Sequence, residues 1–229
     1  MVIALILLSL WTLGQSTAQP VFKPEVGQGG KDAVWVPTSP ALVEKMLDLA
    51  KVTPDDLVMD LGSGDGRMVI AAARRGARAV GVEYNPEMVK LSRQLAREAG
   101  VDDRATFVEG DMYEADISKA TVLALFLLTE NLKRLEPKFR ALRPGTRIVV
   151  NTFGIPDWKP DATDQVTDDC MSWCTALLYV VKPPRYNGVG QTHAAAGFAR
   201  GRDAERTDAR DSRSPADHRR IRHLRTARR

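Results

Sequence analysis

A turn with glycines at three alternate positions, Gly62, Gly64 and Gly66, constrains the fold of this chain more than any other feature. It follows a short apolar run, 57–61, which is typical of a buried strand in a parallel sheet that is covered on both faces. A run of good helix formers, 68–75, follows the turn. Because glycine has no Cβ, the backbone can turn sharply and approach a ligand closely. Strand, turn and helix together predict an α/β fold that binds a nucleotide-like ligand at this edge of the sheet.

The glycine spacing argues against a dinucleotide. A dinucleotide fingerprint needs glycine at the first, third and sixth positions of the loop, and here Arg67 occupies the sixth. Asp60, at the mouth of the turn, would repel a pyrophosphate and suits a ligand that carries an ammonium group. A nicotinamide-dependent oxidoreductase is therefore disfavoured. A tight turn with no ligand is the alternative interpretation, and Asp65 and Arg67 are candidates for fixing the loop.

Two further predicted strands also end in carboxylates. The run 79–83 ends in Glu83, about 20 residues after the glycines, where an acid can bind ribose hydroxyls. The run 106–109 is followed by Asp111. Because the carboxyl ends of parallel strands meet at one edge, we expect Asp60, Glu83 and Asp111 to share that edge. Each acid alone is also explained as a helix cap or a solvated charge, but three in register argue against coincidence.

At these residues the chain resembles the class I S-adenosylmethionine-dependent methyltransferases, whose motif I looks like the run from Asp60 to Gly66. Glu83 stands where that family has its ribose-binding acid, and Asp111 where it has its adenine-side acid. The resemblance covers 34–181 and implies a doubly wound, mostly parallel, Rossmann-like sheet with an antiparallel edge strand. The residues that it implies for binding S-adenosyl-L-methionine are Asp60, Gly62, Ser63, Gly64, Gly66, Glu83, Tyr84, Asp111 and Met112.

The rest of the pattern continues the alternation of strands and helices. Ser39–Pro40 and Asn85–Pro86 are typical helix starts, because Ser and Asn cap a helix and Pro fits its first position. Pro37–Thr38 resembles the family's segment that covers the cofactor, and an ordinary lead-in to a helix is the alternative. We expect helices at 41–50, 85–99 and 130–142, strands at 121–128, 146–151 and 176–181, and an irregular stretch at 154–169.

Composition bounds the domain organisation. Residues 200–229 hold eleven Arg against five acids, and removing this surplus of +6 from the total of +4 leaves −2 for residues 1–199. The folded domain is therefore not expected to bind nucleic acid. We predict a signal peptide or membrane anchor at 1–19, a linker at 20–33, the methyltransferase domain at 34–182 and a disordered Arg-rich tail at 183–229. The tail is interpreted either as a polyanion-binding segment or as the product of a shifted reading frame.

The N-terminal apolar run predicts export to the periplasm or membrane anchoring and membrane association, with a buried helix in a cytoplasmic protein as the alternative. Cys170 and Cys174 have no His or second Cys pair nearby, so no metal site is expected. Two ordinary thiols are the favoured interpretation, since a disulfide requires an oxidising compartment.

The sequence constrains the acceptor of the methyl group less than it constrains the cofactor. Methyl transfer mainly requires positioning of a nucleophile, so no catalytic residue is assigned. The stretch 126–130 lacks the Asn/Asp-Pro-Pro-Tyr motif of many amide and nucleobase methyltransferases. The motifs look most like those of small protein-lysine methyltransferases, including those that act on the ATP synthase c-subunit, which implies a protein lysine. Glu130, Asn151 and Asp157 are candidates for orienting it, although structural roles are favoured for each. A non-catalytic module that binds a nucleoside is the alternative.

Overall fold

The computed structural model describes residues 22–168, 170 and 172–184. The predicted signal peptide or anchor at 1–19 and nearly all of the predicted tail therefore lie outside the described residues. In the described part of the chain, no helix is both long enough and apolar enough to cross a membrane.

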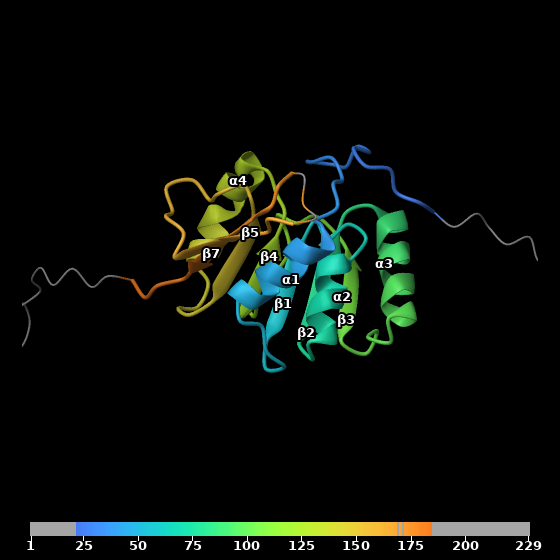
Figure 1. The fold of residues 1–229 in the computed structure, drawn as a ribbon, viewed down its shortest axis with the longest axis horizontal. Helices are drawn as coiled ribbons and strands as arrows, with labels where there is room; N and C mark the ends of the chain where they lie inside the picture. Colours follow the sequence, from blue (N-terminus) through green and yellow to red (C-terminus); the bar gives the residue numbers. More distant parts are fainter. Residues whose placement is uncertain (1–21, 169, 171, 185–229) are drawn as a thin grey trace, which may run out of the picture. The chain divides into compact units, whose positions relative to one another are not determined.

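A seven-stranded sheet in the order β3-β2-β1-β4-β5-β7-β6 forms the centre of the domain (Figure 1). Five strands are parallel, and β7 pairs antiparallel with both β5 and β6. The doubly wound, mostly parallel sheet with an antiparallel edge is thus confirmed. The strands are β1 (Leu57–Leu61), β2 (Arg78–Glu83), β3 (Ala105–Glu109), β4 (Val122–Leu125), β5 (Arg147–Asn151), β6 (Ala162–Gln165) and β7 (Thr175–Val180).

Helices cover both faces of the sheet. Three helices pack on one face in a single apolar cluster, and the fourth packs on the opposite face in a second cluster with the loop 110–121. Ser39 and Asn85 cap their helices as predicted, each accepting a hydrogen bond from a backbone N–H in the first turn. The helices are α1 (Pro40–Leu49), α2 (Arg67–Arg74) and α3 (Pro86–Glu98) on the first face and α4 (Thr129–Arg140) on the second.

Two parts of the sheet differ from the sequence prediction. The stretch 154–169, predicted to be irregular, contains β6, whose polar residues alternate between half-buried and exposed positions. One face of β6 is exposed, so it does not need the apolar run that marks a strand covered on both faces. The strand predicted at 121–128 ends at Leu125, because Phe126 and Leu127 leave the sheet and line a pocket.

Candidate functional site

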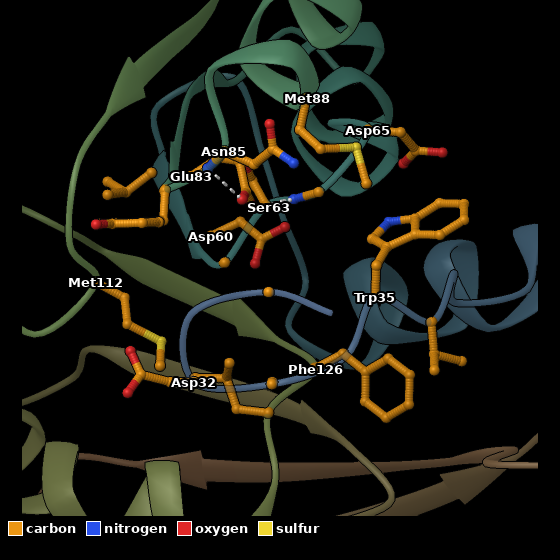
Figure 2. Close-up of a pocket in the computed structure, with 18 of the residues that line it drawn as sticks. Asp32, Trp35, Asp60, Ser63, Asp65, Glu83, Asn85, Met88, Met112 and Phe126 are labelled. Atoms are coloured by element: carbon orange, nitrogen blue, oxygen red, sulfur yellow. Dashed lines mark hydrogen bonds between the residues drawn. The ribbon is translucent and has the colours of Figure 1, made fainter. Parts of the chain in front are cut away.

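A pocket lies at the edge of the sheet where β1, β2 and β4 end (Figure 2). Eight of the nine predicted binding residues line this pocket, and Gly66 does not. The structure therefore brings together acids and glycines that lie far apart in the sequence. The eight are Asp60, Gly62, Ser63, Gly64, Glu83, Tyr84, Asp111 and Met112.

The glycine turn has the backbone conformation that its sequence predicts. Gly62 and Gly64 have φ angles of 75° and 55°, which favour glycine. The N–H of Gly62 donates to the carbonyl of Val82 at 2.8 Å, which attaches the turn to the end of β2. A Cβ on Gly64 would lie 2.6 Å from the indole nitrogen of Trp35, so a larger residue there would displace this side chain.

Gly66 is required by packing rather than by the pocket. It precedes the first residue of α2 with a φ of 80°. A Cβ at this position would lie 2.5 Å from the ring of Phe107 and 2.9 Å from the Cβ of Ser92. The third glycine of the motif therefore allows α2, α3 and β3 to pack closely beneath the turn.

Asp60 is the most deeply buried of the acids that line the pocket, with only 6% of its surface exposed. No described residue donates a hydrogen bond to its carboxylate, and burial, followed by the charges of Glu83 and Asp65, raises its pKa to about 8. The hydroxyl of Ser63, three residues further on, is also buried without a partner among the described residues. The Ser63 hydroxyl lies against Gly81 of β2, whereas Asp60 lacks a partner that a cationic ligand would supply.

Glu83 is held at the mouth of the pocket by two backbone groups. One carboxylate oxygen accepts from the N–H of Gly64 at 2.9 Å, and the other accepts from the N–H of Asn85 at 2.9 Å. Both oxygens retain lone pairs for further donors. Tyr84 lies at the rim of the pocket and is 55% exposed. This exposure fits a side chain that packs beside a ligand, and it fits equally an aromatic side chain at the rim that contacts no ligand.

Asp111 is paired within the protein. Its carboxylate binds the ammonium group of Lys31 and accepts from the N–H of Tyr113 at 2.9 Å. The hydrogen bond from Lys31 is the main cause that lowers the pKa of Asp111. Lys31 also lies 5.1 Å from the ring centre of Tyr84 and so links two pocket residues.

The segment 28–38 forms a wall of the pocket, and sequence reasoning assigned only its last two residues, Pro37–Thr38, to the site. Within the stretch predicted as a linker, the chain turns at Gly27, whose N–H donates to the carbonyl of Trp35 at 2.9 Å. The backbone N–H of Trp35 donates in return to the carbonyl of Gln28 at 2.9 Å. The closely spaced glycines at 27–30 were the available signal for this turn.

Arg67 connects this wall to the glycine turn. Its guanidinium pairs with Asp65 at 2.6 Å and donates to the carbonyl of Thr38 at 2.7 Å. The prediction that Asp65 and Arg67 fix the loop agrees with these contacts. Thr38 is buried and lines the pocket, which is the position expected of the Pro37–Thr38 segment.

The candidates for orienting an acceptor are not brought together. Glu130 and Asp157 are exposed and do not line the pocket. Asn151, at the end of β5, is buried and donates to the hydroxyl of Thr38 at 3.3 Å. Its side-chain oxygen has no hydrogen-bond partner among the described residues.

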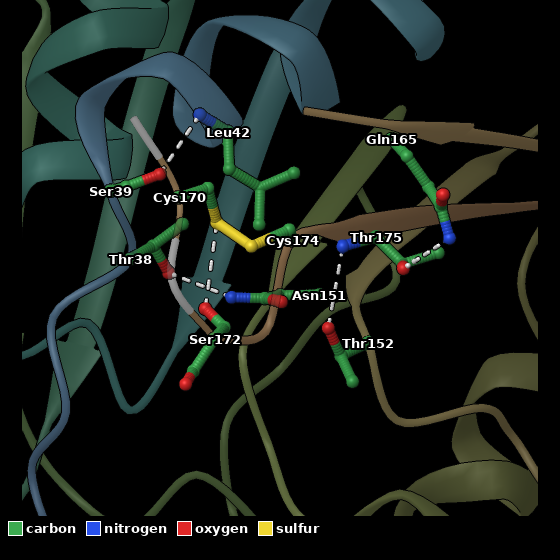
Figure 3. Close-up of a disulfide and its surroundings, with 10 residues drawn as sticks. All are labelled: Thr38, Ser39, Leu42, Asn151, Thr152, Gln165, Cys170, Ser172, Cys174 and Thr175. Carbon is green, nitrogen blue, oxygen red and sulfur yellow. Dashed lines mark hydrogen bonds between the residues drawn. A yellow bond between two sulfur atoms is a disulfide. The ribbon is translucent and has the colours of Figure 1, made fainter. Parts of the chain in front are cut away.

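Cys170 and Cys174 form a disulfide, so the interpretation as two free thiols was wrong. Trp173 adopts a φ of 56°, which turns the short loop back on itself. The Cα atoms of the two cysteines are then 5.8 Å apart, within the usual range for a disulfide. Figure 3 shows the disulfide near Thr38 and Asn151, beside the pocket wall.

The domain matches known methyltransferases over most of its length. Residues 60–162 match the family model described as the ANTKMT methyltransferase domain. A protein-lysine N-methyltransferase of Saccharolobus islandicus (strain REY15A) is 44% identical over 150 residues, which cover 64% of this chain and 92% of that protein. The Homo sapiens lysine N-methyltransferase of the ATP synthase c-subunit is 36% identical over 56% of this chain and 54% of its own length. The chain therefore spans about half the length of this human relative.

A solved structure supports the same fold. The crystal structure of an RNA methyltransferase from Salinibacter ruber in complex with S-adenosyl-L-homocysteine is 42% identical, with a TM-score of 0.62. The match covers 68% of this chain and 100% of that one.

The pocket suits S-adenosyl-L-methionine, the cofactor of this family. Asp60, a buried carboxylate without a donor among the described residues, suits its ammonium group, and Glu83 retains lone pairs for its ribose hydroxyls. Met112 offers an apolar side chain beside the adenine-side acid, Asp111. The contact that each of these residues makes with the cofactor is a prediction. The matches along the domain show that the chain is a class I S-adenosylmethionine-dependent methyltransferase and belongs to the same family as the protein-lysine methyltransferases that it resembles.

Proposed function

We propose that this enzyme methylates the side-chain nitrogen of a protein lysine. The observation that carries the proposal is the 44% identity to a protein-lysine N-methyltransferase over 92% of that relative's length. A non-catalytic role is not favoured, because the named relatives across the domain are enzymes.

The charges of the pocket support an acceptor that arrives as a cation. Asp32 lines the pocket without a paired cation in the described chain, whereas Asp60 suits the ammonium group of the cofactor and Asp111 is paired with Lys31. Figure 2 shows Asp32 and Phe126 on one side of Asp60, and Glu83 and Ser63 on the other. Acidic side chains attract a lysine ammonium group, which must lose a proton before its nitrogen attacks.

The bound cofactor would supply an electrophilic methyl group on a sulfonium. The chain's own residues bind and orient the reactants and exclude water from the pocket. Thr38 and Trp35, held by Arg67 and Gly27, close one side of the pocket.

RNA is the second candidate acceptor, because the Salinibacter ruber relative is an RNA methyltransferase. Proteins that bind RNA backbones need clustered positive charge. Here residues 1–199 carry a net charge of −2, and more acidic than basic side chains line the pocket. These charges favour the lysine acceptor.

A labelling experiment tests the proposal. The purified full chain is incubated with methyl-labelled S-adenosylmethionine and, separately, with total protein and total RNA from its source cells. We expect label in protein, and mass spectrometry should map it to methylated lysines. The Gly64→Arg variant is the control, because even a Cβ at this position collides with Trp35. Label in RNA and none in protein would reverse the assignment.

A further inference from the structure

We propose that Phe126, Phe153 and Trp173 form an aromatic wall against which the aliphatic part of the acceptor lysine packs. We include in the proposal that the Cys170–Cys174 disulfide holds Trp173 in this wall. The inference rests on the proposed lysine acceptor and assigns residues that determine its binding.

The position of the aromatic wall in the sheet separates it from the predicted cofactor residues. Phe126 follows β4, Phe153 follows β5, and Trp173 precedes the antiparallel strand β7, so all three lie at the same edge. Asp60, the next-to-last residue of β1, and Glu83, the last residue of β2, lie at that edge. The sheet order places the acids at the ends of β1, β2 and β3, and the aromatic wall beside the ends of β4, β5 and β7.

Direct contacts join the three rings. The rings of Phe126 and Phe153 are stacked, with centres 6.2 Å apart and an angle of 11° between their planes. The centre of Trp173 lies 6.0 Å from that of Phe126 at an angle of 55°. Phe126 also lines the pocket, so the aromatic wall is continuous with it.

Trp173 keeps a large apolar surface available for a partner. It is 44% exposed although it contacts Phe126, and a tryptophan of this exposure gains stability when an apolar group covers it. A lysine offers a matching partner, because its four-carbon chain packs on aromatic faces while its charged end interacts with their π electrons. Asp32, which lines the same pocket, complements that charge.

The backbone around the aromatic wall is strained and cross-linked. Thr152 and Trp173 both have a φ of 56°, an uncommon conformation for residues other than glycine. The N–H of Thr152 donates to the carbonyl of Thr175 at 2.7 Å, which ties the ends of β5 and β7 together. Such conformations persist only where neighbouring structure enforces them, and they cluster at functional sites.

The disulfide supplies the remaining constraint. It closes the short loop from Cys170 to Cys174, and Trp173 lies inside this loop. Figure 3 shows the disulfide in the neighbourhood of Thr38, Asn151 and Thr152. Opening the loop removes the covalent restraint on the Trp173 backbone and lets the indole leave the aromatic wall.

Kinetics of the full-length enzyme test this inference with poly-L-lysine as the acceptor probe. We expect Trp173→Ala to raise the KM for poly-L-lysine about tenfold, the order of one lost aromatic contact to a cation, with kcat within about twofold. Trp173→Phe should restore most of the affinity. Val108→Ala, a change to an exposed residue of the distant strand β3, is the matched control and should behave like wild type.

The role of the disulfide is tested in the same assay. Dithiothreitol converts the disulfide into two thiols while it closes into a cyclic disulfide itself, and it should raise the KM of the wild type. The Cys170→Ser/Cys174→Ser variant should show a raised KM without the reductant and no further response to it. Calorimetric affinity for S-adenosyl-L-homocysteine should be the same in every variant.

The outcomes separate the two proposals. If wild type methylates poly-L-lysine and Trp173→Ala has an unchanged KM, the aromatic wall is refuted while the lysine acceptor stands. A parallel loss of cofactor affinity in Trp173→Ala would also overturn it, because the residue would then support the fold. If wild type binds the cofactor but labels neither poly-L-lysine nor any cell protein, the lysine acceptor fails and the inference fails with it.

Discussion

The carboxyl group of Asp60 shows at the scale of one residue how binding and stability oppose each other. Burial raises its pKa to about 8, from an ordinary value of 3.8 in the unfolded chain. Between these values the folded protein binds more protons at this site than the unfolded chain does. The free energy of unfolding therefore falls as the pH rises from about 4 to 8, and the full cost is present above pH 8.

Replacing this carboxylate with an amide should stabilise the free protein and impair its function. A pKa raised from 3.8 to about 8 corresponds to about 6 kcal/mol, but the amide of Asn would itself be buried without a partner and offset part of this. We therefore expect Asp60→Asn to raise the free energy of unfolding at pH 8 by about 1–3 kcal/mol. The gain should shrink towards about pH 3, where Asp60 is protonated in the folded state and largely so in the unfolded chain. Thermal unfolding at the two pH values measures it, and calorimetry should show at least about tenfold weaker binding of S-adenosyl-L-homocysteine. A lower melting temperature for Asp60→Asn at pH 8 would instead mean that the carboxylate is paired within the protein.

At the scale of elements, the edge of the sheet opposite the pocket has its own polar network. Asp56, just before β1, accepts from the N–H of Thr53 at 2.8 Å and from the hydroxyl of Thr121 at 2.7 Å. It also pairs with Arg147, the first residue of β5. Burial opposes ionisation of Asp56, but the bonds from Thr121, Thr53 and Arg147 outweigh it and hold its pKa below the usual value. The network therefore joins the starts of β1, β4 and β5.

We expect Asp56→Asn to lower the free energy of unfolding by about 3 kcal/mol at pH 7, because it leaves Arg147 without its partner. The stabilisation by the wild-type carboxylate is present above its unfolded pKa and is lost as the pH falls through its lower folded value. Urea unfolding at pH 7 measures the difference. Affinity for S-adenosyl-L-homocysteine should not change, because the network lies at the far edge of the sheet. The exposed pair Lys90–Glu87 provides the control, and Glu87→Gln should cost less than about 1 kcal/mol.

Elements with strong local patterns could be predicted from the sequence. The first strand, its glycine turn and α2 follow from an apolar run, three glycines and good helix formers, and their bounds agree within one residue. The polar edge strand β6 has no such pattern, because it is covered on one side only. The pocket wall at 28–35 depends on contacts with the distant glycine turn and the loop after β3, which no local pattern reveals.

The site shows the same division. Asp60, Glu83 and Asp111 were predictable because parallel strands bring their carboxyl ends to one edge. The partner of Asp111, Lys31, was not predictable, since the two residues lie 80 positions apart. The disulfide was missed because its formation depends on the turn at Trp173. The four-residue spacing of Cys170 and Cys174 alone did not distinguish a disulfide from two free thiols.

At the scale of the whole molecule, the disulfide bears on where the enzyme works. Disulfides persist in oxidising compartments and are rare in the cytosol of most cells. The N-terminal apolar run predicts export or anchoring independently of the cysteines. We therefore propose that the domain carrying Cys170 and Cys174 faces an oxidising compartment, although S-adenosylmethionine is made in the cytosol.

Trapping of thiols in intact cells tests this proposal. Cells that express the full chain are quenched with acid, and free thiols are alkylated with a maleimide that adds mass to each cysteine. We expect Cys170 and Cys174, the only cysteines of the chain, to remain unmodified until the sample is reduced. The Cys170→Ser variant, with one unpaired thiol, is the control and should be alkylated without reduction. Full alkylation of both wild-type thiols would place the domain in a reducing compartment, where Trp173 would lack its covalent restraint and acceptor binding would be weaker than in the oxidised enzyme.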